Sequence, residues 1–281
     1  MNDDSRLDDV RSFFASMLAA ASGSSDPRLQ RIFADVRREA FLPPGPWQIM
    51  VDHCYLTTPS ADPIFLYQNV LVALDAARGI NNGEPFLHAK WIGKTALQAG
   101  ESVVHIGAGT GYYTALLAEL VRPGGTVTAF ELQPTLAAAA KQNLKPYSNV
   151  SVITGDAVME AIPAADLIYV NAGVVAPPLS WMQALKPNGR MILPWRPNSE
   201  TGLAIMIRRC DDGFEVEPLM HAYFIPCVGA SNAATTQKTP SYVDAWRSRS
   251  IRLRATTAPD ETATAIYADL WFSSRQVADG Q

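Results

Sequence analysis

The sequence has few cysteines, no excess of basic residues and no long apolar run. Its three cysteines, Cys54, Cys210 and Cys227, are odd in number and widely spaced, which is typical of reduced thiols and not of a disulfide framework. A formal net charge of −4 argues against nucleic acid or a membrane surface as a partner, because both are bound by basic faces. No apolar run approaches about 18 residues, and the start "MNDDSRLDDV" is acidic where a signal peptide is basic. We therefore expect a cytoplasmic protein that binds neither nucleic acid nor membrane, and the sequence leaves its oligomeric state open.

The composition is that of a globular protein. With 48% hydrophobic and 18% charged residues, a chain of 281 residues has ample material for one packed core. The pattern divides into three regions, residues 1–90, 91–228 and 229–281. The first is expected to be helical and irregular. "LDDVRSFFASMLAAA" carries an apolar helical stripe, and "DPRLQRIFADVRREAFLPPGPW" predicts a second helix that Pro43 and Pro44 stop.

Residues 91–228 alternate between strand-like and helical patterns. Apolar runs rich in β-branched residues predict seven strands, at 102–107, 126–132, 150–154, 166–171, 190–194, 203–208 and 220–226. Helical patterns lie between the early strands, at 111–121, 134–144 and 178–185. Strand, helix and strand at this spacing predict an α/β fold with a parallel sheet. The last strands follow one another without a helix, so the end of the sheet is expected to be antiparallel.

The third region, residues 229–281, is predicted to be a linker and a small appendage. "GASNAATTQKTPS" is polar and rich in small residues, and "SIRLRAT" alternates like a strand. In "DETATAIYADLWFS" the apolar residues share one helical stripe, with Asp260 as a candidate N-cap. The residues of that stripe are Ala263, Ile266, Tyr267, Leu270 and Trp271. The sequence therefore predicts a strand followed by a helix.

A glycine-rich turn joins the first strand of the sheet to a helix, in "VVHIGAGTGYYTALLAELV". Gly107, Gly109 and Gly111 lie where the strand ends, so backbone N–H groups and a helix N-terminus meet at one point. Glu131 ends the next strand, twenty residues beyond Gly111. A carboxylate at that distance can accept hydrogen bonds from both hydroxyls of a ribose. The alternative is a solvated carboxylate at the end of a strand.

The glycine spacing favours S-adenosylmethionine over a dinucleotide as the cofactor. A dinucleotide site spaces its glycines as GxGxxG and leaves room for a pyrophosphate, whereas this turn reads GAGTGYY and has no basic residue beside it. S-adenosylmethionine has a ribose and an adenine but no phosphate. A third strand ends at Gly155, Asp156 and Ala157, where the aspartate can accept a hydrogen bond from the adenine amino group. By itself Asp156 would also fit a helix cap.

These motifs together resemble the protein-L-isoaspartate O-methyltransferases. The resemblance lies in the order and spacing of "VVHIGAGTGYYTALLAELV", "FEL", "GDA", "DLIYVNAGVVAPPLSWMQALKPNGRMILP" and "YFIPC", and it covers roughly residues 28–228. It implies a doubly wound, mostly parallel, seven-stranded Rossmann-like sheet with helices on both faces and an antiparallel strand near one edge. Residues 91–228 would then bind the cofactor, with Leu132 beside Glu131 in the site. It also implies a protein or peptide carboxylate, that of an isoaspartyl residue, as the methyl acceptor.

The stretch "GINNGEPFLHAK", residues 79–90, is similar to the loop that covers the cofactor in this family. Pro85 matches the proline of the family's Ser-x-Pro core, and Ala89 matches its alanine. His88 matches a histidine found near the amino-acid end of the cofactor, so the resemblance implies a binding role, with general base as the alternative for a hydroxyl acceptor. A plain turn remains the other interpretation of the Asn-Asn-Gly sequence.

Gly83 occupies the position of the family's serine, which helps to hold the acceptor carboxylate. The resemblance therefore places Gly83 and His88 at the catalytic positions, with Asn81 and Asn82 as possible amide donors in place of the hydroxyl. The departure keeps two alternatives open, which are a different peptide or small-molecule acceptor and a cofactor-binding module without transferase activity.

Other polar groups are expected to be structural. Asp52, His53 and Cys54 are adjacent and therefore fit a loop better than a metal site. His105 and His221 lie in predicted strands and are expected to be core histidines. The basic run "RSRSIRLR", residues 247–254, is expected to be a solvated strand face.

Overall fold

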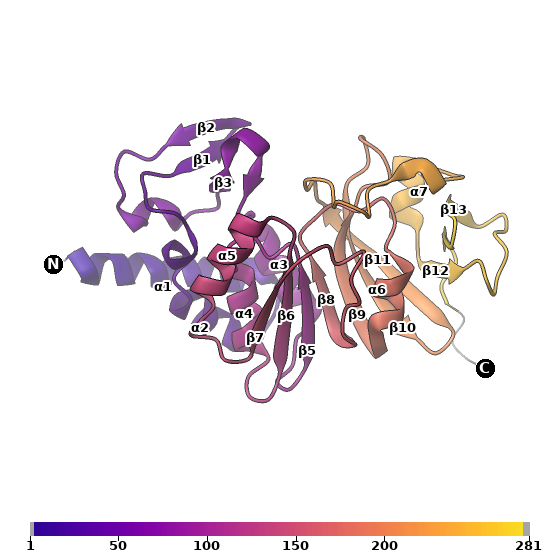
Figure 1. The fold of residues 1–281 in the computed structure, drawn as a ribbon, viewed down its shortest axis with the longest axis horizontal. Coiled ribbons are helices and arrows are strands. Elements are labelled where there is room, and N and C mark those ends of the chain that lie inside the picture. Colours follow the sequence, from indigo (N-terminus) through magenta and orange to yellow (C-terminus); the bar gives the residue numbers. More distant parts are fainter. Residues whose placement is uncertain (1–2, 278–281) are drawn as a thin grey trace. The chain divides into compact units, whose positions relative to one another are not determined.

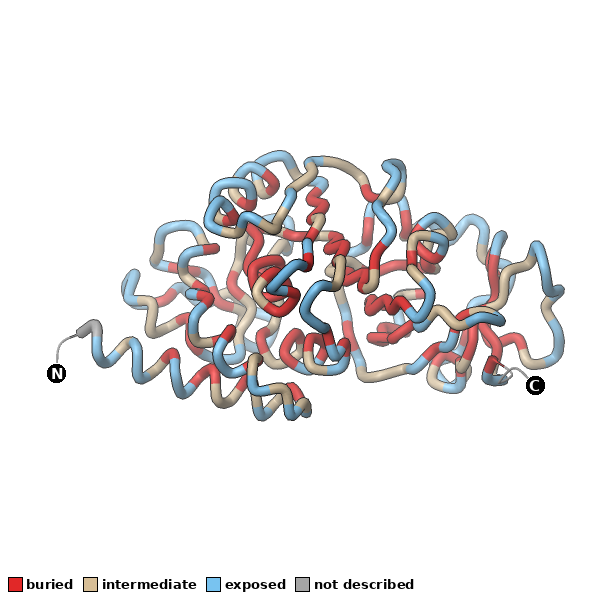
Figure 2. The backbone as a smooth tube through the Cα atoms, turned by 90° about the horizontal axis from the view of Figure 1, so that it is seen from below, coloured by how far each residue is buried: buried red, intermediate tan, exposed pale blue. Residues whose placement is uncertain are grey.

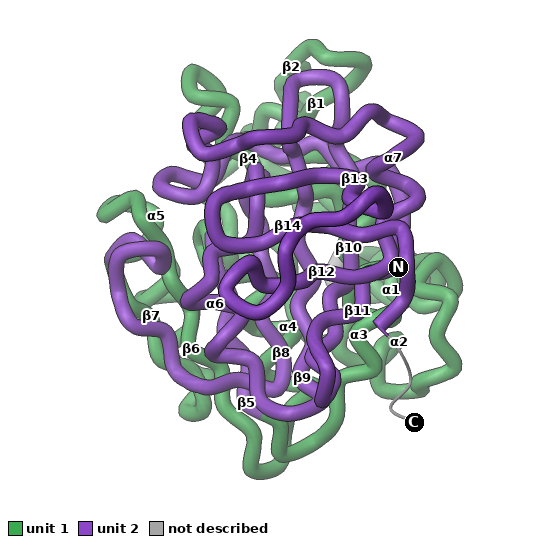
Figure 3. Tube along the Cα trace, turned by 90° about the vertical axis from the view of Figure 1, so that its right-hand side faces the viewer, with its two compact units in different colours: residues 1–101, 108–154 green, residues 102–107, 155–281 purple. Residues whose placement is uncertain are grey.

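The computed structural model describes residues 3–277. The chain folds into two compact units, one of residues 1–101 and 108–154, and one of residues 102–107 and 155–281 (Figure 3). Among the described residues, none of the helices combines the length and hydropathy that a bilayer-spanning helix needs. The division of the chain at residues 90 and 228 stays a prediction.

The first unit is mainly helical, as labelled in Figure 1. Its helices are α1 (Asp3–Ser22), α2 (Arg28–Asp35), α3 (Pro85–Thr95), α4 (Tyr112–Leu120), α5 (Pro134–Asn143) and the 3₁₀ turn η1 (Arg38–Phe41). The apolar stripe predicted for the first helix is confirmed, because Phe14 and Leu18 are buried where α1 packs on α2 and α3. The second predicted helix is too long. α2 ends at Asp35, since Val36 takes an extended conformation, and this break lets Arg38 turn into the interior.

Residues 48–81 form two short hairpins in the part of the sequence that shows no clear period. β1 (Gln48–Val51) pairs with β2 (Cys54–Thr57), and β3 (Ala73–Asp75) pairs with β4 (Ile80–Asn81). The 3₁₀ turns η2 (Pro63–Leu66) and η3 (Ala76–Arg78) lie between and within them. Asp52 and His53 have φ of 45° and 63° and make the tight turn of the first hairpin. The structural interpretation of Asp52, His53 and Cys54 is therefore confirmed.

The first unit also contains a parallel βαβ motif. β6 (Thr126–Glu131) and β7 (Val150–Thr154) run parallel, and α5 connects them and packs on β7. Both strands and the helix were predicted within two residues of their ends. Eight of the nine residues of α4 are buried, as expected for a helix at the centre of a core, and Figure 2 colours the backbone by burial, with buried residues in red.

The second unit is built on eight strands of a mixed sheet, which lie in the order β13-β14-β12-β11-β10-β9-β8-β5. The parallel strands are β5 (Ser102–Ile106), β8 (Ala165–Val170) and β9 (Leu185–Trp195), and α6 (Leu179–Ala184) precedes β9. The antiparallel strands are β10 (Leu203–Cys210), β11 (Gly213–His221), β12 (Ser250–Leu253), β13 (Ala263–Ile266) and β14 (Leu270–Ser273). The chain thus has the predicted α/β fold, with helices flanking a mixed sheet that turns antiparallel after β9. The last predicted strand, at 220–226, corresponds to β11, which begins earlier. A tight turn pairs Cys210 of β10 with Gly213, so β11 starts directly after β10.

The prediction of a C-terminal helix over residues 260–273 is wrong. Residues 263–266 and 270–273 form the antiparallel strands β13 and β14, and Asp260 accepts a hydrogen bond from Thr262 N without starting a helix. Among the described residues of this region, 229–277, the helical elements are the 3₁₀ turn η4 (Ala233–Thr235) and the helix α7 (Tyr242–Arg247). The segment 260–273 contains Thr, Ile, Tyr, Trp and Phe, which favour strands. The packing of these side chains in the sheet prevails over their helical spacing. The predicted strand at "SIRLRAT" is confirmed as β12, and its arginines are partly exposed as expected.

Candidate functional site

The glycine turn between β5 and α4 has the backbone that the motif predicts. Gly107, Gly109 and Gly111 have φ of 77°, 57° and 100°, all in the left-handed region. At Gly111, the N-cap of α4, a Cβ atom would lie 2.7 Å from Leu144 Cδ1. The turn therefore needs glycine, and it brings the first N–H groups of α4 to one point, where a polar ligand can bind.

The Glu131 carboxylate lies against this turn in the first unit. Its Oε2 accepts a hydrogen bond from Gly109 N at 2.7 Å, and its Oε1 accepts one from Gln133 N at 2.9 Å. The side chain is only 7% exposed, and burial raises the pKa of the carboxyl while the two backbone N–H groups lower it. Each oxygen keeps lone-pair capacity for a further donor, such as a ribose hydroxyl. Leu132, the next residue, is 37% exposed.

The β3–β4 hairpin also reaches the glycine turn. A Cβ atom at Gly109 would lie 3.5 Å from Leu74 Cδ1, so the Leu74 side chain lies beside the turn at van der Waals distance. Sequence reasoning missed Leu74, because residues 50–90 show no period from which a strand or a face can be assigned. An apolar side chain in this position can shield a ligand at the turn from water.

The loop at residues 79–90 combines a turn with a helix start. Asn81 Oδ1 accepts a hydrogen bond from Gly83 N at 2.9 Å, which makes a local Asx turn, and α3 begins at Pro85. Gly83 has a φ of 78°. Asn81 Nδ2 donates to Gly79 O at 3.3 Å, so the side chain of Asn81 serves the turn itself.

The same loop contacts the start of α4 through His88. The His88 ring is 1% exposed and stacks on Tyr113, with 3.6 Å between ring centroids and 22° between planes. A Cβ atom at Gly83 would lie 2.4 Å from His88 Nε2 and 3.0 Å from Tyr113 Cε2. The imidazole therefore fills the space beside Gly83 that a serine side chain would need. The turn interpretation of this stretch is confirmed by the Asx turn, and its interpretation as the rim of a site stays a prediction.

Arg38 holds the segments around this loop together. Its Nη1 donates to Leu66 O at 2.6 Å, and its Nη2 donates to Val70 O at 2.7 Å and to Asn82 Oδ1 at 3.1 Å. Asn82 Oδ1 also accepts from Val72 N at 3.1 Å. No sequence pattern distinguishes Arg38 from its neighbour Arg37, so its role could be found only from the fold.

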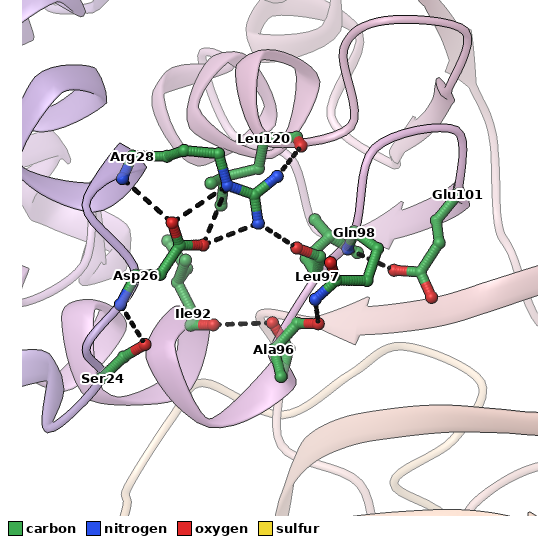
Figure 4. A network of polar contacts seen from close by, with 10 residues as sticks. Ser24, Asp26, Arg28, Ile92, Ala96, Leu97, Gln98, Glu101 and Leu120 are labelled. Atoms are coloured by element: carbon green, nitrogen blue, oxygen red, sulfur yellow. Dashed lines mark hydrogen bonds and ion pairs between the residues drawn. The ribbon is translucent and has the colours of Figure 1, made fainter.

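A second arginine, Arg28, fixes the helices that carry His88 and Tyr113 (Figure 4). Its Nη2 donates to Leu97 O at 2.6 Å, just beyond α3, and its Nη1 donates to Leu120 O at 3.0 Å, at the end of α4. Asp26 pairs with the same guanidinium at 2.6 Å, and this hydrogen bond lowers the pKa of the aspartate. The far ends of α3 and α4 are thereby tied to the start of α2.

The remaining predicted site residues, Gly155, Asp156 and Ala157, belong to the second unit with Gly107. Asp156 Oδ1 accepts a hydrogen bond from Val158 N at 2.9 Å, so this carboxylate caps the turn that follows β7. Ala157 O accepts from Trp181 Nε1 at 2.9 Å. The adenine contact of Asp156 stays a prediction.

The two other strand histidines differ in their surroundings. His105 is a satisfied core histidine, as expected: its ring nitrogen lies 2.9 Å from Asn171 Nδ2, and burial lowers its pKa to about 3. The expectation that His221 is a core histidine is wrong, because the residue is exposed at the end of β11. Its Nε2 lies 2.9 Å from Tyr242 Oη. Within residues 3–277 no group of three or more His, Cys, Asp or Glu side chains has the arrangement of a metal site.

Comparisons with known proteins agree with these motifs. The family model described as protein-L-isoaspartate(D-aspartate) O-methyltransferase matches residues 58–232. The protein-L-isoaspartate O-methyltransferase 2 of Rhodopseudomonas palustris is 36% identical over 56% of this chain and 72% of the relative. The protein-L-isoaspartate O-methyltransferase of Anaeromyxobacter dehalogenans is 33% identical over 73% of this chain and 90% of the relative.

Two solved structures share the fold. A protein-L-isoaspartate O-methyltransferase has a TM-score of 0.68 at 21% identity, covering 94% of this chain and 87% of the other. A putative enzyme of the same name from Plasmodium falciparum, in complex with S-adenosyl-L-homocysteine, has a TM-score of 0.61 at 17% identity, covering 77% of this chain and 97% of the other. At these identities the likeness extends to the fold alone.

Proposed function

The chain belongs to the protein-L-isoaspartate O-methyltransferase family, and we propose that it transfers a methyl group from S-adenosylmethionine to the side-chain carboxylate of isoaspartyl residues in damaged proteins. The observation that carries the proposal is the packing of the loop at 79–90 on the start of α4. Through Gly83, His88 and Tyr113 this loop lies beside the helix that the glycine turn begins. Gly83, His88 and Tyr113 all belong to the first unit, so this packing supports a loop for the acceptor beside the helix that follows the cofactor turn.

The residues present fit the cofactor. The glycine turn offers backbone N–H groups, and the Glu131 carboxylate on Gly109 N has lone pairs left for two hydroxyl groups of a ribose. In this proposal Gly155, Asp156 and Ala157 serve the adenine, Leu132 lies beside it, and His88 binds the amino-acid end. The cofactor supplies a methyl group on a positively charged sulfur, which is already activated for displacement.

A carboxylate acceptor needs little chemical help from the protein. It is ionised at neutral pH, so no general base has to remove a proton before methyl transfer. The chain instead aligns the acceptor and excludes water, for which the buried His88 and Tyr113 rings and the apolar Leu74 are suited. The three cysteines are free thiols, which fits the reducing cytoplasm in which the proposal places the reaction.

The proposal is tested by transfer of a labelled methyl group to a synthetic isoaspartyl peptide. An aspartyl peptide of the same sequence is the matched acceptor control, and Glu131→Ala is the protein control. We expect label in the isoaspartyl peptide alone, and a loss of about 2–4 kcal/mol in cofactor binding for Glu131→Ala, which removes two charge-assisted hydrogen bonds. Equal labelling of the two peptides, or none with a folded enzyme, contradicts the proposal.

A second candidate is methylation of another peptide or small-molecule acceptor on the same scaffold. It is favoured by the imidazole of His88, which fills the space beside Gly83 where the family's serine side chain would lie. A cell extract offered as a general acceptor separates the possibilities. Label in extract components but not in the isoaspartyl peptide supports the second candidate, and no label in either supports a module that binds cofactor without transferring a methyl group.

The proposed role of His88 has its own test in His88→Phe, which keeps an aromatic ring stacked on Tyr113 but removes both ring nitrogens. If the imidazole binds the cofactor, affinity for S-adenosylhomocysteine should fall by about tenfold, the effect of one hydrogen bond to a charged group. The rate at saturating cofactor should change little. A normal affinity combined with a large loss of rate would instead identify His88 as a base.

A further inference from the structure

Arg38 is a buried cation without a carboxylate partner. The residue is 0% exposed, and within the described part of the chain its guanidinium donates only to the backbone oxygens of Leu66, Gln68 and Val70 and to the amide oxygen of Asn82. Burial lowers the pKa of the guanidinium, yet an arginine stays charged in a protein. The charge is therefore solvated by neutral dipoles alone, which is a costly arrangement unless an anion is to be bound nearby.

Two hydrogen-bonding atoms on other side chains are unpartnered, in addition to Arg38 Nε itself. Within residues 3–277, Asn82 Nδ2 and Tyr113 Oη are closed to solvent and have no hydrogen-bond partner. Their side chains belong to residues that are 8% and 5% exposed. A buried donor without an acceptor is unfavourable, so such an atom calls for an explanation, and a ligand that accepts from it is one.

The orientation of the Asn82 amide is determined by its neighbours. Both groups that contact its oxygen, Arg38 Nη2 and Val72 N, are donors, so this end of the amide must be the oxygen and the unpartnered end the NH₂ group. The ring edge of Tyr113 lies 3.0 Å from where a Cβ at Gly83 would lie, and Asn82 precedes Gly83 in the chain. Both side chains with an unpartnered atom therefore belong to the surroundings of Gly83.

We propose that Asn82 Nδ2 and Tyr113 Oη form a carboxylate-binding subsite under this loop, with Arg38 as the positioning residue that orients the amide and supplies the positive charge. A carboxylate has two oxygens for the two donors and one negative charge for the one uncompensated guanidinium. In the family a serine hydroxyl at this position helps to hold the acceptor carboxylate, and at Gly83 no hydroxyl is present, so the subsite supplies other donors. This inference rests on the proposed function, in which the carboxylate belongs either to the peptide acceptor or to the amino-acid end of the cofactor.

A ligand reaches the two atoms when the segment at 79–84 moves away from Tyr113. Gly79 and Gly83, with φ of 66° and 78°, lie at or near its ends and give it backbone freedom. The segment is held by the β3–β4 pairing of Asn81, by Asn69 Nδ2 on Glu84, and by the bonds of Asn82 to Arg38 and Val72. The bonds of Asn82 involve only its amide oxygen and its backbone. The amide NH₂ group remains available to the ligand.

Asn82→Asp is the sharpest variant, because it keeps the acceptor oxygen and replaces the donor by a negatively charged oxygen. The new carboxylate pairs with Arg38, so the melting temperature should stay equal to that of the wild type or rise, whereas a bound carboxylate is repelled. We expect a loss of at least about tenfold in affinity for the carboxylate ligand, since one donor is lost. Asn232→Asp is the charge-matched control, because its exposed side chain caps η4 (Ala233–Thr235) and aspartate caps equally well.

Tyr113→Phe tests the second donor if the aspartate variant does not fold. It removes one unpartnered oxygen and keeps the stack on His88, so stability should not fall, while carboxylate affinity should fall by about tenfold. Tyr55→Phe is the matched control: Tyr55 Oη is likewise buried and unpartnered among the described residues, but Tyr55 belongs to β2 and not to α4 or the loop at 79–90. A merely structural role for Tyr113 would lower the melting temperature and leave the affinity unchanged.

Binding is measured by calorimetry without turnover, so the result does not depend on methyl transfer. The probes are S-adenosylhomocysteine, methylthioadenosine, which lacks the amino-acid end, and an isoaspartyl peptide added to the S-adenosylhomocysteine complex. If the variants weaken S-adenosylhomocysteine but not methylthioadenosine, the subsite holds the cofactor's carboxylate. If they weaken only the peptide, it holds the acceptor's. Wild-type affinity for all three probes in both variants overturns the proposal, and an inactive wild type with a positive binding result refutes only the proposed function.

Discussion

At the scale of single residues, Gly83 is a position where backbone and packing both oppose a side chain. Its φ is 78°, and a Cβ atom there would lie 2.4 Å from His88 Nε2. Gly83→Ser restores the residue that the family has at this position, yet we expect loss of stability and not a gain in rate. The left-handed backbone alone costs about 1–2 kcal/mol, and displacement of a buried imidazole adds to this. Thermal melting measures the sum.

Gly79→Ser is the matched control for that variant. Gly79 has a similar φ of 66°, but a Cβ atom there meets nothing within 4 Å. The difference between the two melting temperatures therefore isolates the displacement of His88 from the backbone strain. Equal melting temperatures, together with faster methylation by Gly83→Ser, would show that the loop accommodates the serine and that His88 moves without loss.

Glu131 gives the site a pH dependence whose sign follows from burial. Burial raises the pKa of this carboxyl above its ordinary value of 4.5, more than the N–H groups of Gln133 and Gly109 lower it. A raised pKa in the folded state means that the contribution to stability is present below the unfolded pKa and is lost as pH rises through the folded pKa. Relative to wild type, Glu131→Gln should therefore gain in free energy of unfolding as pH rises from 4 to 7 in urea titrations without ligand.

The affinity for S-adenosylhomocysteine should change with pH in the opposite direction. The ionised carboxylate is the better acceptor for hydroxyl groups, so wild-type affinity should rise through the same pH window and the affinity of Glu131→Gln should stay flat. Parallel pH curves for the two proteins would mean that Glu131 does not titrate in this range or does not contact the ligand.

Which site residues the sequence could predict depended on whether a local motif marks them. The glycine turn, Glu131 and His88 stand at fixed positions in recognisable patterns, and the structure shows their local geometry. Arg38 and Leu74 have no such mark, and although Tyr113 stands in the glycine motif, its contact with His88 appears only in the fold. Arg38 meets Asn82 across 44 residues of sequence, and a contact of that kind exists only once the fold has formed.

At the scale of elements, the spacing of apolar residues predicted the strands of the sheet correctly but predicted a helix wrongly for residues 260–273. The strands β5, β8 and β10 are mostly buried, largely apolar runs, so their positions follow from the sequence. In residues 263–271 the same spacing fits both one helix and two short strands. Burial against the sheet decides for strands there, because Phe272 of β14 stacks on Trp195 of β9 at 4.1 Å between ring centroids.

That stack makes the C-terminal hairpin part of the core of the second unit. Phe272 is 0% exposed, so Phe272→Ala should lower the free energy of unfolding by about 3–5 kcal/mol, through lost burial and the cavity that remains. Val243→Ala on α7 is the control, because Val243 is 61% exposed and should matter by less than about 0.5 kcal/mol. Chemical denaturation followed by tryptophan fluorescence measures both. A small effect at Phe272 would mean that the hairpin does not pack on β9.

At the scale of the whole molecule, the cofactor should stabilise the fold and a dinucleotide should not. The turn GAGTGYY leaves no third glycine at the spacing that a pyrophosphate needs, and no basic residue stands in or beside it. A ligand that binds only the folded state adds about 2.7 kcal/mol at a hundredfold excess over its Kd. S-adenosylhomocysteine should therefore raise the melting temperature of the wild type, whereas NAD at the same concentration should leave it unchanged. Glu131→Ala should lose most of the shift, since the ribose then lacks its carboxylate. A shift with NAD equal to that with S-adenosylhomocysteine would exclude the cofactor assignment on which the proposed chemistry depends.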